Sequence, residues 1–311
     1  MTEYKNITVN NIEDETRIDK WLKRNFPLLT QSYIENKLRR GLIRINSKKI
    51  KSNYRVLEGD VVNISGFSEN IFSKKHISKF KKFISSAIFK KFNDSIIYES
   101  NDFLVINKWS GISVHDGSKQ EISIDNLIKN ISHTYSLVHR LDKETTGLLL
   151  ISKNYKSARN FGKLFKNSEI EKIYLAICHG TPKNLSSIIK IDISKKNSNQ
   201  KLETITNYVV INKSNKFSLI LFKPITGRTH QLRIISKYLN CPIVGDNKYG
   251  YKNTRYSKEK FMLNAFNIKF NINNTKYEFS SKIPNFFINF IKKTKLRIPK
   301  IEKIKNLSKT F

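Results

Sequence analysis

Apolar residues recur at helical spacing near the start of the 311-residue chain. The positions that would share one face of this first helix are Ile18, Trp21, Leu22 and Phe26. Ser32 and Glu35 form a capping-box pattern, which predicts that a second helix begins there and ends at Gly41. Short apolar runs at 42–45 and 61–64, bounded by turn residues, predict strands. Residues 16–65 are therefore predicted to form one small domain.

From Ile96 onward the pattern changes to apolar runs of strand length that are separated by loops. We expect strands at 96–99, 103–107, 148–151, 173–179, 206–212, 217–224, 266–272 and 277–279, and helices at 156–165, 232–239 and after Pro284. This order predicts an α+β chain whose second domain is a mixed, mostly antiparallel sheet. We assign 96–295 to that domain, 66–95 to a basic linker that contains a helix, and 296–311 to a basic tail.

The charge of the chain narrows its possible partners. Lys and Arg number 58 against 25 Asp and Glu, a formal net charge of +33. Self-repulsion of that size opposes compaction, so a polyanionic partner is expected, with nucleic acid first and a membrane surface second. No apolar run is long enough to span a membrane, and the N-terminus lacks a signal-type core. The two cysteines, Cys178 and Cys241, exclude a disulfide framework and favour a cytoplasmic location.

Basic residues gather on the second helix of the small domain and at its exit. They are Lys37, Arg39, Arg40, Arg44, Lys48 and Lys49. Charge alone explains them equally well as a solvated surface. The order helix, helix, short β segment, with the run LRRGLIRINSKKI, resembles the S4 RNA-binding domain. This resemblance implies that the domain binds structured RNA through its shape and phosphates.

The segment HRLDKETTGLLL, residues 139–150, contains the strongest chemical signal. Asp142 stands between cationic side chains, directly before a Thr-Thr-Gly turn and an apolar run. Cationic neighbours favour the ionised form of a carboxylate, so Asp142 is a candidate nucleophile. An isolated Asp in such a run is more often a structural ion pair, here with Arg140 or Lys143.

Two further segments could reach the same site. KIYLAI carries Tyr174, and TGRTHQLRI carries Arg228, His230 and Arg233. Each alone has a structural explanation, as a strand aromatic, a surface cation or a turn histidine. Together with Asp142 they resemble the pseudouridine synthases of the RluA type, which modify ribosomal and transfer RNA. Five ordered motifs between about Ile97 and Pro284 carry the resemblance: YESNDFLVINKWSGISVH, HRLDKETTGLLLISKN, EKIYLAICHG, PITGRTHQLRI and CPIVGDNKYG.

The resemblance implies a reaction and three catalytic residues. The N1–C1′ bond of uridine breaks, the base rotates, and C5 joins C1′. Asp142 would be the catalytic carboxylate, and Arg233 would hold it ionised and oriented. Tyr174 would stack on the target base and assist removal of the C5 proton.

The resemblance also implies how the substrate is bound. A base that is modified must leave the stack, and Arg140 would fill the vacated position. Leu232 would form an apolar wall, and Arg228 and His230 would also bind substrate. An S4 domain ahead of this domain resembles the large-ribosomal-subunit enzymes of the C and D types, and the short N-terminal arm favours the C type. The expected partner is 23S ribosomal RNA, free or in an assembling subunit, bound by a monomer.

No cofactor or metal is expected, because the isomerisation adds no atoms and the chain has no Gly-rich dinucleotide loop or P-loop. A non-catalytic S4-type RNA-binding protein is the alternative from another class. The same chemistry on a D-type rRNA site or on tRNA is the second alternative. A zinc deaminase fails for lack of an H-x-E with C-x-x-C, and a zinc site at Cys178, His179 and Cys241 lacks paired spacing.

Overall fold

The structure is a computed structural model. It describes residues 4–10, 13, 15–68, 71–72, 84–116, 122–194, 200–252, 256–299 and 304. Most of the predicted basic tail and the central part of the predicted linker lie outside these residues.

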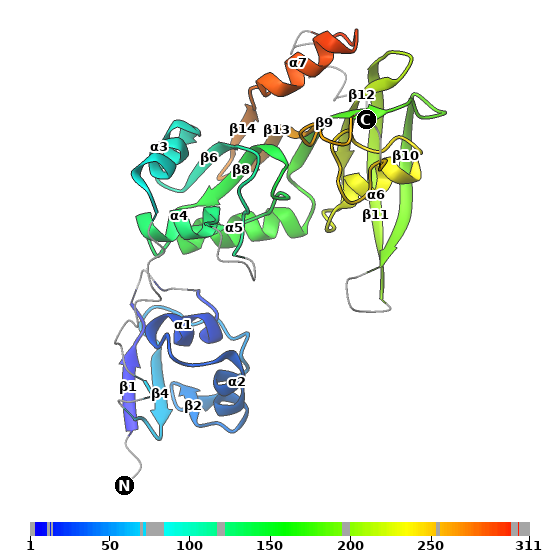
Figure 1. Ribbon diagram of the computed structural model, residues 1–311. Helices are drawn as coiled ribbons and strands as arrows, with labels where there is room; N and C mark the ends of the chain where they lie inside the picture. The colour runs from blue at the N-terminus through cyan, green and yellow to red at the C-terminus, as the bar shows by residue number, and fades with distance from the viewer. Residues whose placement is uncertain are drawn as a thin grey trace.

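The small N-terminal domain combines a four-stranded sheet with two helices (Figure 1). Its elements are β1 (Tyr4–Thr8), α1 (Ile18–Asn25), α2 (Gln31–Arg39), β2 (Ile43–Ile45), β3 (Lys48–Lys49) and β4 (Val61–Ser65). The strand order is β1-β4-β2-β3, and all pairs are antiparallel. Trp21 and Leu22 of α1 and Ile34 of α2 are fully buried in the core of this domain. Gly41 follows α2 with φ +70°, as predicted for a helix stop. Strand β1 was not predicted.

The start of α2 differs from the prediction. Thr30 is the N-cap, and its hydroxyl accepts a hydrogen bond from the N–H of Tyr33 at 3.2 Å. Ser32 already lies inside the helix. The Glu35 side chain accepts a bond from the Gln31 side chain at 2.9 Å instead of capping the backbone. The capping-box prediction is wrong, because the extended backbone that an N-cap requires occurs two residues earlier, at Thr30.

The second domain is built on a ten-stranded mixed sheet with order β10-β11-β12-β9-β13-β8-β6-β5; β14 pairs with β13, and β7 with β8. Its strands are β5 (Ile96–Glu99), β6 (Phe103–Lys108), β7 (Ser136–Leu137), β8 (Thr146–Ser152), β9 (Glu171–His179), β10 (Ser186–Ser194), β11 (Lys201–Lys213), β12 (Phe217–Pro224), β13 (Leu263–Ile272) and β14 (Thr275–Ser280). Its helices are α3 (Ser86–Asp94), α4 (Ile124–Ile131), α5 (Tyr155–Lys166), α6 (Gln231–Tyr238) and α7 (Asn285–Lys293). All described pairs are antiparallel except β8 with β13. The predicted α+β class with a mostly antiparallel sheet is confirmed.

The parallel contact between β8 and β13 depends on one glycine. Gly147 has φ +103° and lies opposite Ala265 of β13. A Cβ on Gly147 would overlap the backbone of Ala265, so only glycine allows the two strands to approach here. Beside it, the Asn264 side chain donates a bond to the Thr146 hydroxyl at 2.9 Å. This contact fixes the start of β8, and therefore the loop before it, in the middle of the sheet.

Three elements of this domain, α4, β7 and β10, were not predicted, and one helix lies in the predicted linker. Helix α4 begins with a capping box formed by Ser123 and Asn126. Strand β10 is an edge strand in which more and less exposed residues alternate. Helix α3 occupies the end of the predicted linker, and its Phe92 is buried with residues of β6 and β8. The described residues include no helix long and apolar enough to cross a membrane.

The two domains touch at the N-terminal half of α5 (Figure 1). The guanidinium of Arg24 lies 3.8 Å from the ring centre of Tyr155. One turn further along α5, Arg159 forms an ion pair with Glu15. Both contacts join a side chain of α1, or one just before it, to a side chain of α5.

Candidate active site

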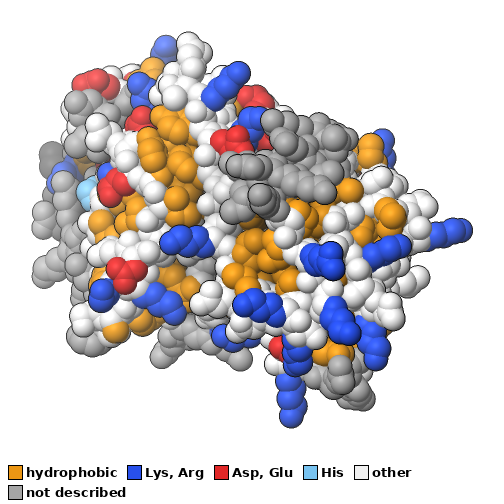
Figure 2. Space-filling model, turned by 90° about the horizontal axis from the view of Figure 1, so that it is seen from above, with side chains coloured by type: hydrophobic (Ala, Val, Ile, Leu, Met, Phe, Trp, Pro, Cys, Tyr) orange, Lys and Arg blue, Asp and Glu red, His pale blue; other side chains and the backbone are white. Residues whose placement is uncertain are grey.

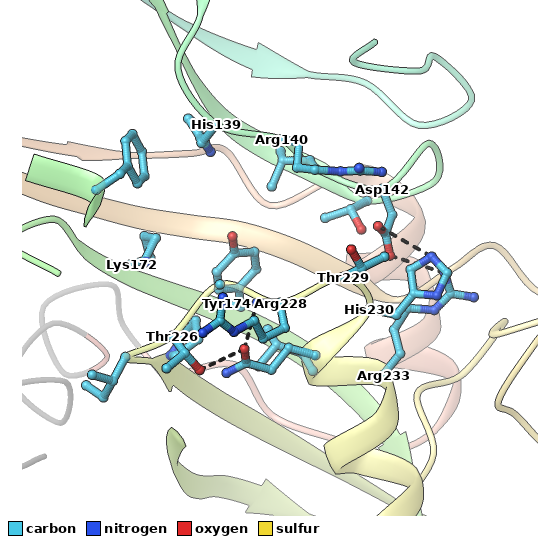
Figure 3. A pocket seen from close by; sticks show the side chains of 18 of the residues that line it. His139, Arg140, Asp142, Lys172, Tyr174, Thr226, Arg228, Thr229, His230 and Arg233 are labelled. Atoms are coloured by element: carbon cyan, nitrogen blue, oxygen red, sulfur yellow. Dashed lines mark hydrogen bonds and ion pairs between the residues drawn. The ribbon is translucent and has the colours of Figure 1, made fainter. Parts of the chain in front are cut away.

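A cleft of about 520 Å³ lies where three separate segments of the second domain meet (Figure 3). The segments are the loop before β8, the end of α5 with the start of β9, and the loop from β12 into α6. All seven residues predicted for catalysis and substrate binding line it: Asp142, Tyr174, Arg233, Arg140, Leu232, Arg228 and His230. The fold thus brings together side chains that are up to 93 positions apart in sequence, from Arg140 to Arg233.

Asp142 lies in a tight turn that leads into β8. Its carbonyl oxygen accepts a bond from the N–H of Thr145 at 3.1 Å. Lys108 also stabilises this turn, because its buried ammonium donates to the carbonyl oxygen of Lys143 at 2.9 Å. The carboxylate itself points into the cleft (Figure 3).

Arg233 of α6 joins Asp142 to a second carboxylate. Its Nη1 donates to Oδ2 of Asp142 at 3.1 Å. Its Nε and Nη2 donate to the two oxygens of buried Asp246, at 2.8 and 2.7 Å. Burial of Arg233 lowers its pKa. The hydrogen bonds and charge of Asp246, and to a smaller extent those of Asp142, outweigh this effect, so the pKa of Arg233 is raised. The guanidinium therefore stays charged and is fixed from behind while it contacts the cleft carboxylate.

Asp246 is held ionised by several donors. Burial opposes its ionisation, but the bonds from Arg233 and from the backbone N–H groups of Tyr249 and Lys248 lower its pKa below the ordinary value. Gly245, with φ +75°, precedes it, and a Cβ there would overlap the backbone of Lys260. The backbone of this loop thus places the Asp246 carboxylate under Arg233.

His230 lies on the other side of the Asp142 carboxylate. Its Nε2 is 3.8 Å from Oδ1 of Asp142, and its Nδ1 is 3.0 Å from the hydroxyl of Tyr249. The residue has φ +56°, a left-handed conformation that turns the chain from the loop into α6. Burial lowers the pKa of His230 most, although the Asp142 charge acts in the opposite direction. A neutral imidazole beside the carboxylate is therefore expected at pH 7.

Tyr174 of β9 faces the same cleft (Figure 3). Burial first, and the charge of Asp142 second, raise the pKa of its phenol well above the ordinary value. The phenol therefore remains protonated at neutral pH. Tyr174 offers an aromatic surface to a flat ligand and has an O–H donor at its edge.

Comparisons with known proteins agree with this geometry. Residues 102–238 match the family model described as RNA pseudouridylate synthase, and residues 16–62 match the S4 domain. A protein of Rickettsia bellii (strain RML369-C) named ribosomal large subunit pseudouridine synthase C is 38% identical over 306 residues, which cover 90% of this chain and 98% of that protein. The chain belongs to the RNA pseudouridine synthase family.

Further relatives and solved structures support the family. A Buchnera aphidicola protein (subsp. Baizongia pistaciae, strain Bp) with the same name is 39% identical over 280 residues, 86% of this chain and 85% of that protein. Human RNA Pseudouridylate Synthase Domain Containing 4 shares the fold, with a TM-score of 0.60 over 68% of this chain and 97% of its own at 24% identity. Human RNA Pseudouridylate Synthase Domain Containing 1 gives 0.52 over 60% and 82% at 26% identity.

The remaining predicted residues of the synthase cleft lie at its rim and wall. Arg140 and Arg228 are exposed, and Leu232 is buried. Gln231 fixes the rim segment, because its side chain bonds the Thr226 hydroxyl and the N–H of Arg228, both at 2.9 Å. An ion pair of Asp142 with Arg140 or Lys143 was the structural alternative. In the structure Asp142 pairs with Arg233 instead.

The predicted RNA-binding residues of the S4 domain lie apart from the synthase cleft. Arg39, Arg40, Arg44, Lys48 and Lys49 are exposed, and Lys37 is partly buried. Arg39 and Lys49 line a groove of about 730 Å³ together with residues of the 50–53 segment. Their part in RNA binding stays a prediction.

Sequence reasoning missed four residues that shape the cleft: Lys108, His139, Lys172 and Asp246. Lys108 donates three bonds of 2.9–3.0 Å to backbone carbonyls. His139 accepts a bond from the N–H of Leu150 at 2.8 Å and stacks on Phe165. All four residues lie within the five sequence motifs, but no local pattern indicates which distant residue each of them contacts.

The described residues contain no group of three His, Cys, Asp or Glu side chains that could hold a metal. Cys178 and Cys241, which were weighed as zinc ligands, are both buried with free thiols. Burial raises the pKa of Cys241 to about 11, which disfavours the thiolate that zinc needs.

Proposed function

We propose that this pseudouridine synthase isomerises uridines of large-subunit ribosomal RNA, with Asp142 as the catalytic carboxylate. The observation that carries the proposal is the ion pair between Asp142 and Arg233 inside a cleft of nucleotide size. A protein that only binds RNA has no need of a carboxylate fixed by an arginine in a cleft that receives a polyanion. The substrate class follows from the names of the relatives that match nearly the whole chain.

The charges of the chain fit a ribosomal RNA substrate. Figure 2 shows many Lys and Arg side chains and few Asp and Glu on one face of the molecule. The net charge of +33 favours a partner with many phosphates. Affinity should therefore fall steeply as salt is added, while the S4 domain adds RNA contacts outside the cleft.

The cleft geometry assigns a task to each side chain. Uridine must be extruded so that its base enters the cleft, where the Tyr174 ring can stack on it. Arg140, exposed beside the cleft, is placed to occupy the space that the base leaves. Asp142 then lies close to the sugar and base of that nucleotide. No atom is added to the substrate, and the C5 hydrogen leaves as a proton after C5 has joined C1′.

The protonation of Tyr174 limits what it can do in this last step. Its raised pKa keeps the phenol neutral, so it cannot accept the C5 proton unless its own proton leaves first. Stacking on the base is the role that the raised pKa favours. Asp142, which has finished its part when C5 and C1′ are joined, is the better acceptor of that proton.

Tritium release from C5-tritiated 23S rRNA transcript tests this function. The wild type should release tritium, and Asp142→Asn should release none while it binds the transcript as tightly by filter binding. A wild type that binds but releases nothing from rRNA, yet releases tritium from tRNA, would reassign the substrate. No release from either RNA would favour a binding protein, and activity of Asp142→Asn would remove Asp142 from the mechanism.

A further inference from the structure

Lys172 is a cleft residue that the proposed chemistry does not use. It lies on β9 two residues before Tyr174, so both side chains point to the same face of the sheet. It lines the cleft together with Phe165 and Lys166 at the end of α5 and Ser168 just after it. Lys172 thus lines the same cleft as Asp142, from the wall beside Tyr174.

The Lys172 ammonium has no carboxylate partner in the described part of the chain. Its ammonium lies over the Phe165 ring, 5.8 Å from Nζ to the ring centre. Lys223, on the neighbouring strand β12, is different, because it forms an ion pair of 2.9 Å with Glu171. Burial lowers the pKa of Lys172, which shows that its charge is poorly solvated.

A partly buried and unpaired cation destabilises the protein, and such groups persist mainly where a ligand completes them. The other cations of the cleft need no such ligand. Arg233 already has two carboxylates, and Arg140, Arg228 and Lys166 are exposed to water. Asp142 is the one carboxylate among the described residues that line the cleft, and Arg233 pairs with it. Among the described residues that line the cleft, Lys172 is therefore the cation that is neither paired with a carboxylate nor exposed to water.

The anion that enters this cleft is carried by the RNA itself. A nucleotide whose base stacks on Tyr174 has its phosphate one ribose away, and Lys172 is the next residue on the same face of β9. We propose that Lys172 binds a phosphodiester oxygen of the target nucleotide and so recognises that the nucleotide has been extruded into the cleft. This inference rests on the proposed function for the identity of that nucleotide.

Three full-length variants test the contact: Lys172→Met, Lys172→Arg and the control Lys223→Met. Met keeps the unbranched chain up to the position of Cε and removes the charge, and Lys223 offers a paired lysine outside the cleft lining. Affinity for 23S rRNA transcript is measured by filter binding between low and high salt, tritium release is measured in parallel, and the midpoint of thermal unfolding is recorded without RNA.

We expect Lys172→Met to bind about tenfold more weakly at low salt, because one charge-assisted bond is lost. The slope of log affinity against log salt should shrink by about one. Lys172→Arg should retain most of the affinity and Lys223→Met nearly all of it. Without RNA, Lys172→Met should unfold at a higher temperature than the wild type, because an unpaired buried charge is gone.

Two results would overturn the proposal. In the first, Lys172→Met and Lys223→Met show the same affinity and salt slope as the wild type. In the second, affinity and slope are unchanged while tritium release falls a hundredfold in both Lys172→Met and Lys172→Arg, which would make Lys172 a proton-transfer group. Binding and turnover are read separately. A weaker, less salt-dependent Lys172→Met therefore supports the contact even if the wild type releases no tritium, and that lack of release would refute only the proposed function.

Discussion

Replacement of Arg233 by Lys tests whether the guanidinium, and not only its charge, makes the site work. Arg233 donates one bond to Asp142 and two to Asp246, and the three donors point in fixed directions. A lysine carries one ammonium at the end of a flexible chain and cannot contact both oxygens of Asp246 while it reaches Asp142. The charge near the cleft is kept, but the orientation of Asp142 is lost.

The size of the effect follows from the bonds removed. A hydrogen bond between charged groups contributes about 1.5–3 kcal/mol. If the bond to Asp142 matters mainly in the transition state, its loss lowers the rate of the chemical step by roughly 10- to 150-fold, since about 1.4 kcal/mol is a factor of ten. Loss of one of the two bonds to buried Asp246 should also lower the free energy of unfolding by about 1.5–3 kcal/mol.

Single-turnover tritium release at saturating enzyme gives the rate of the chemical step, and urea unfolding gives the stability. Arg228→Lys is the matched control, because Arg228 lies on the same segment but is exposed and has no carboxylate partner in the described structure. The control should change the rate less than threefold. A rate for Arg233→Lys within threefold of the wild type, with intact folding, would refute the view that Arg233 orients Asp142.

Three other substitutions test how the cleft is supported. Gly147→Ala should cost at least about 3 kcal/mol in urea unfolding, because a Cβ overlaps the β13 backbone, whereas Gly111→Ala, with φ +89° and open space, should cost only the 1–2 kcal/mol or so of a left-handed residue. Lys108→Met should cost about 3 kcal/mol, roughly one for each carbonyl left without its donor, and should slow tritium release. Burial, and to a smaller extent the charge of Lys172, lower the pKa of His139 to about 3. As the pH falls below 6.5, His139 gains a proton in the unfolded chain but not in the folded protein, so the free energy of unfolding decreases. Between pH 6.5 and 5 the wild type should lose about 1.6 kcal/mol more than His139→Gln, and an equal loss would contradict a neutral His139.

Most helices and strands could be predicted because their patterns are local. The run from Leu148 to Ile151 is apolar throughout, and the whole of β8 is buried. The segment 217–224 was predicted with the bounds that the structure gives β12. Strand β10 was missed although its sequence carries a local signal, because Ile189, Ile191 and Ile193 alternate with polar residues, as is typical of a strand with one exposed face.

The candidate site was predictable only in part, for a physical reason. Asp142, Tyr174 and Arg233 were recognised because each lies in a motif, and the fold places all three in one cleft. The residues that fix them were missed because their contacts span long distances in sequence. Lys108 bonds a carbonyl 35 positions away, and that distance appears in no periodicity or spacing rule.

The arrangement of two carboxylates on one guanidinium fits the proposed role of Asp142, because it fixes this carboxylate and leaves one of its oxygens without a bond from Arg233. If Nε and Nη2 of Arg233 donated to Asp142, both oxygens of this carboxylate would be occupied. These two donors bond Asp246 instead, and the Asp142 carboxylate accepts a single hydrogen bond from Arg233, which Nη1 donates to Oδ2. Its Oδ1 has no hydrogen bond among the described residues, with the His230 ring 3.8 Å away. Under the proposed mechanism, Asp246→Asn should therefore lower tritium release, because Nε and Nη2 of a freed Arg233 would turn to Asp142 and occupy its second oxygen as well.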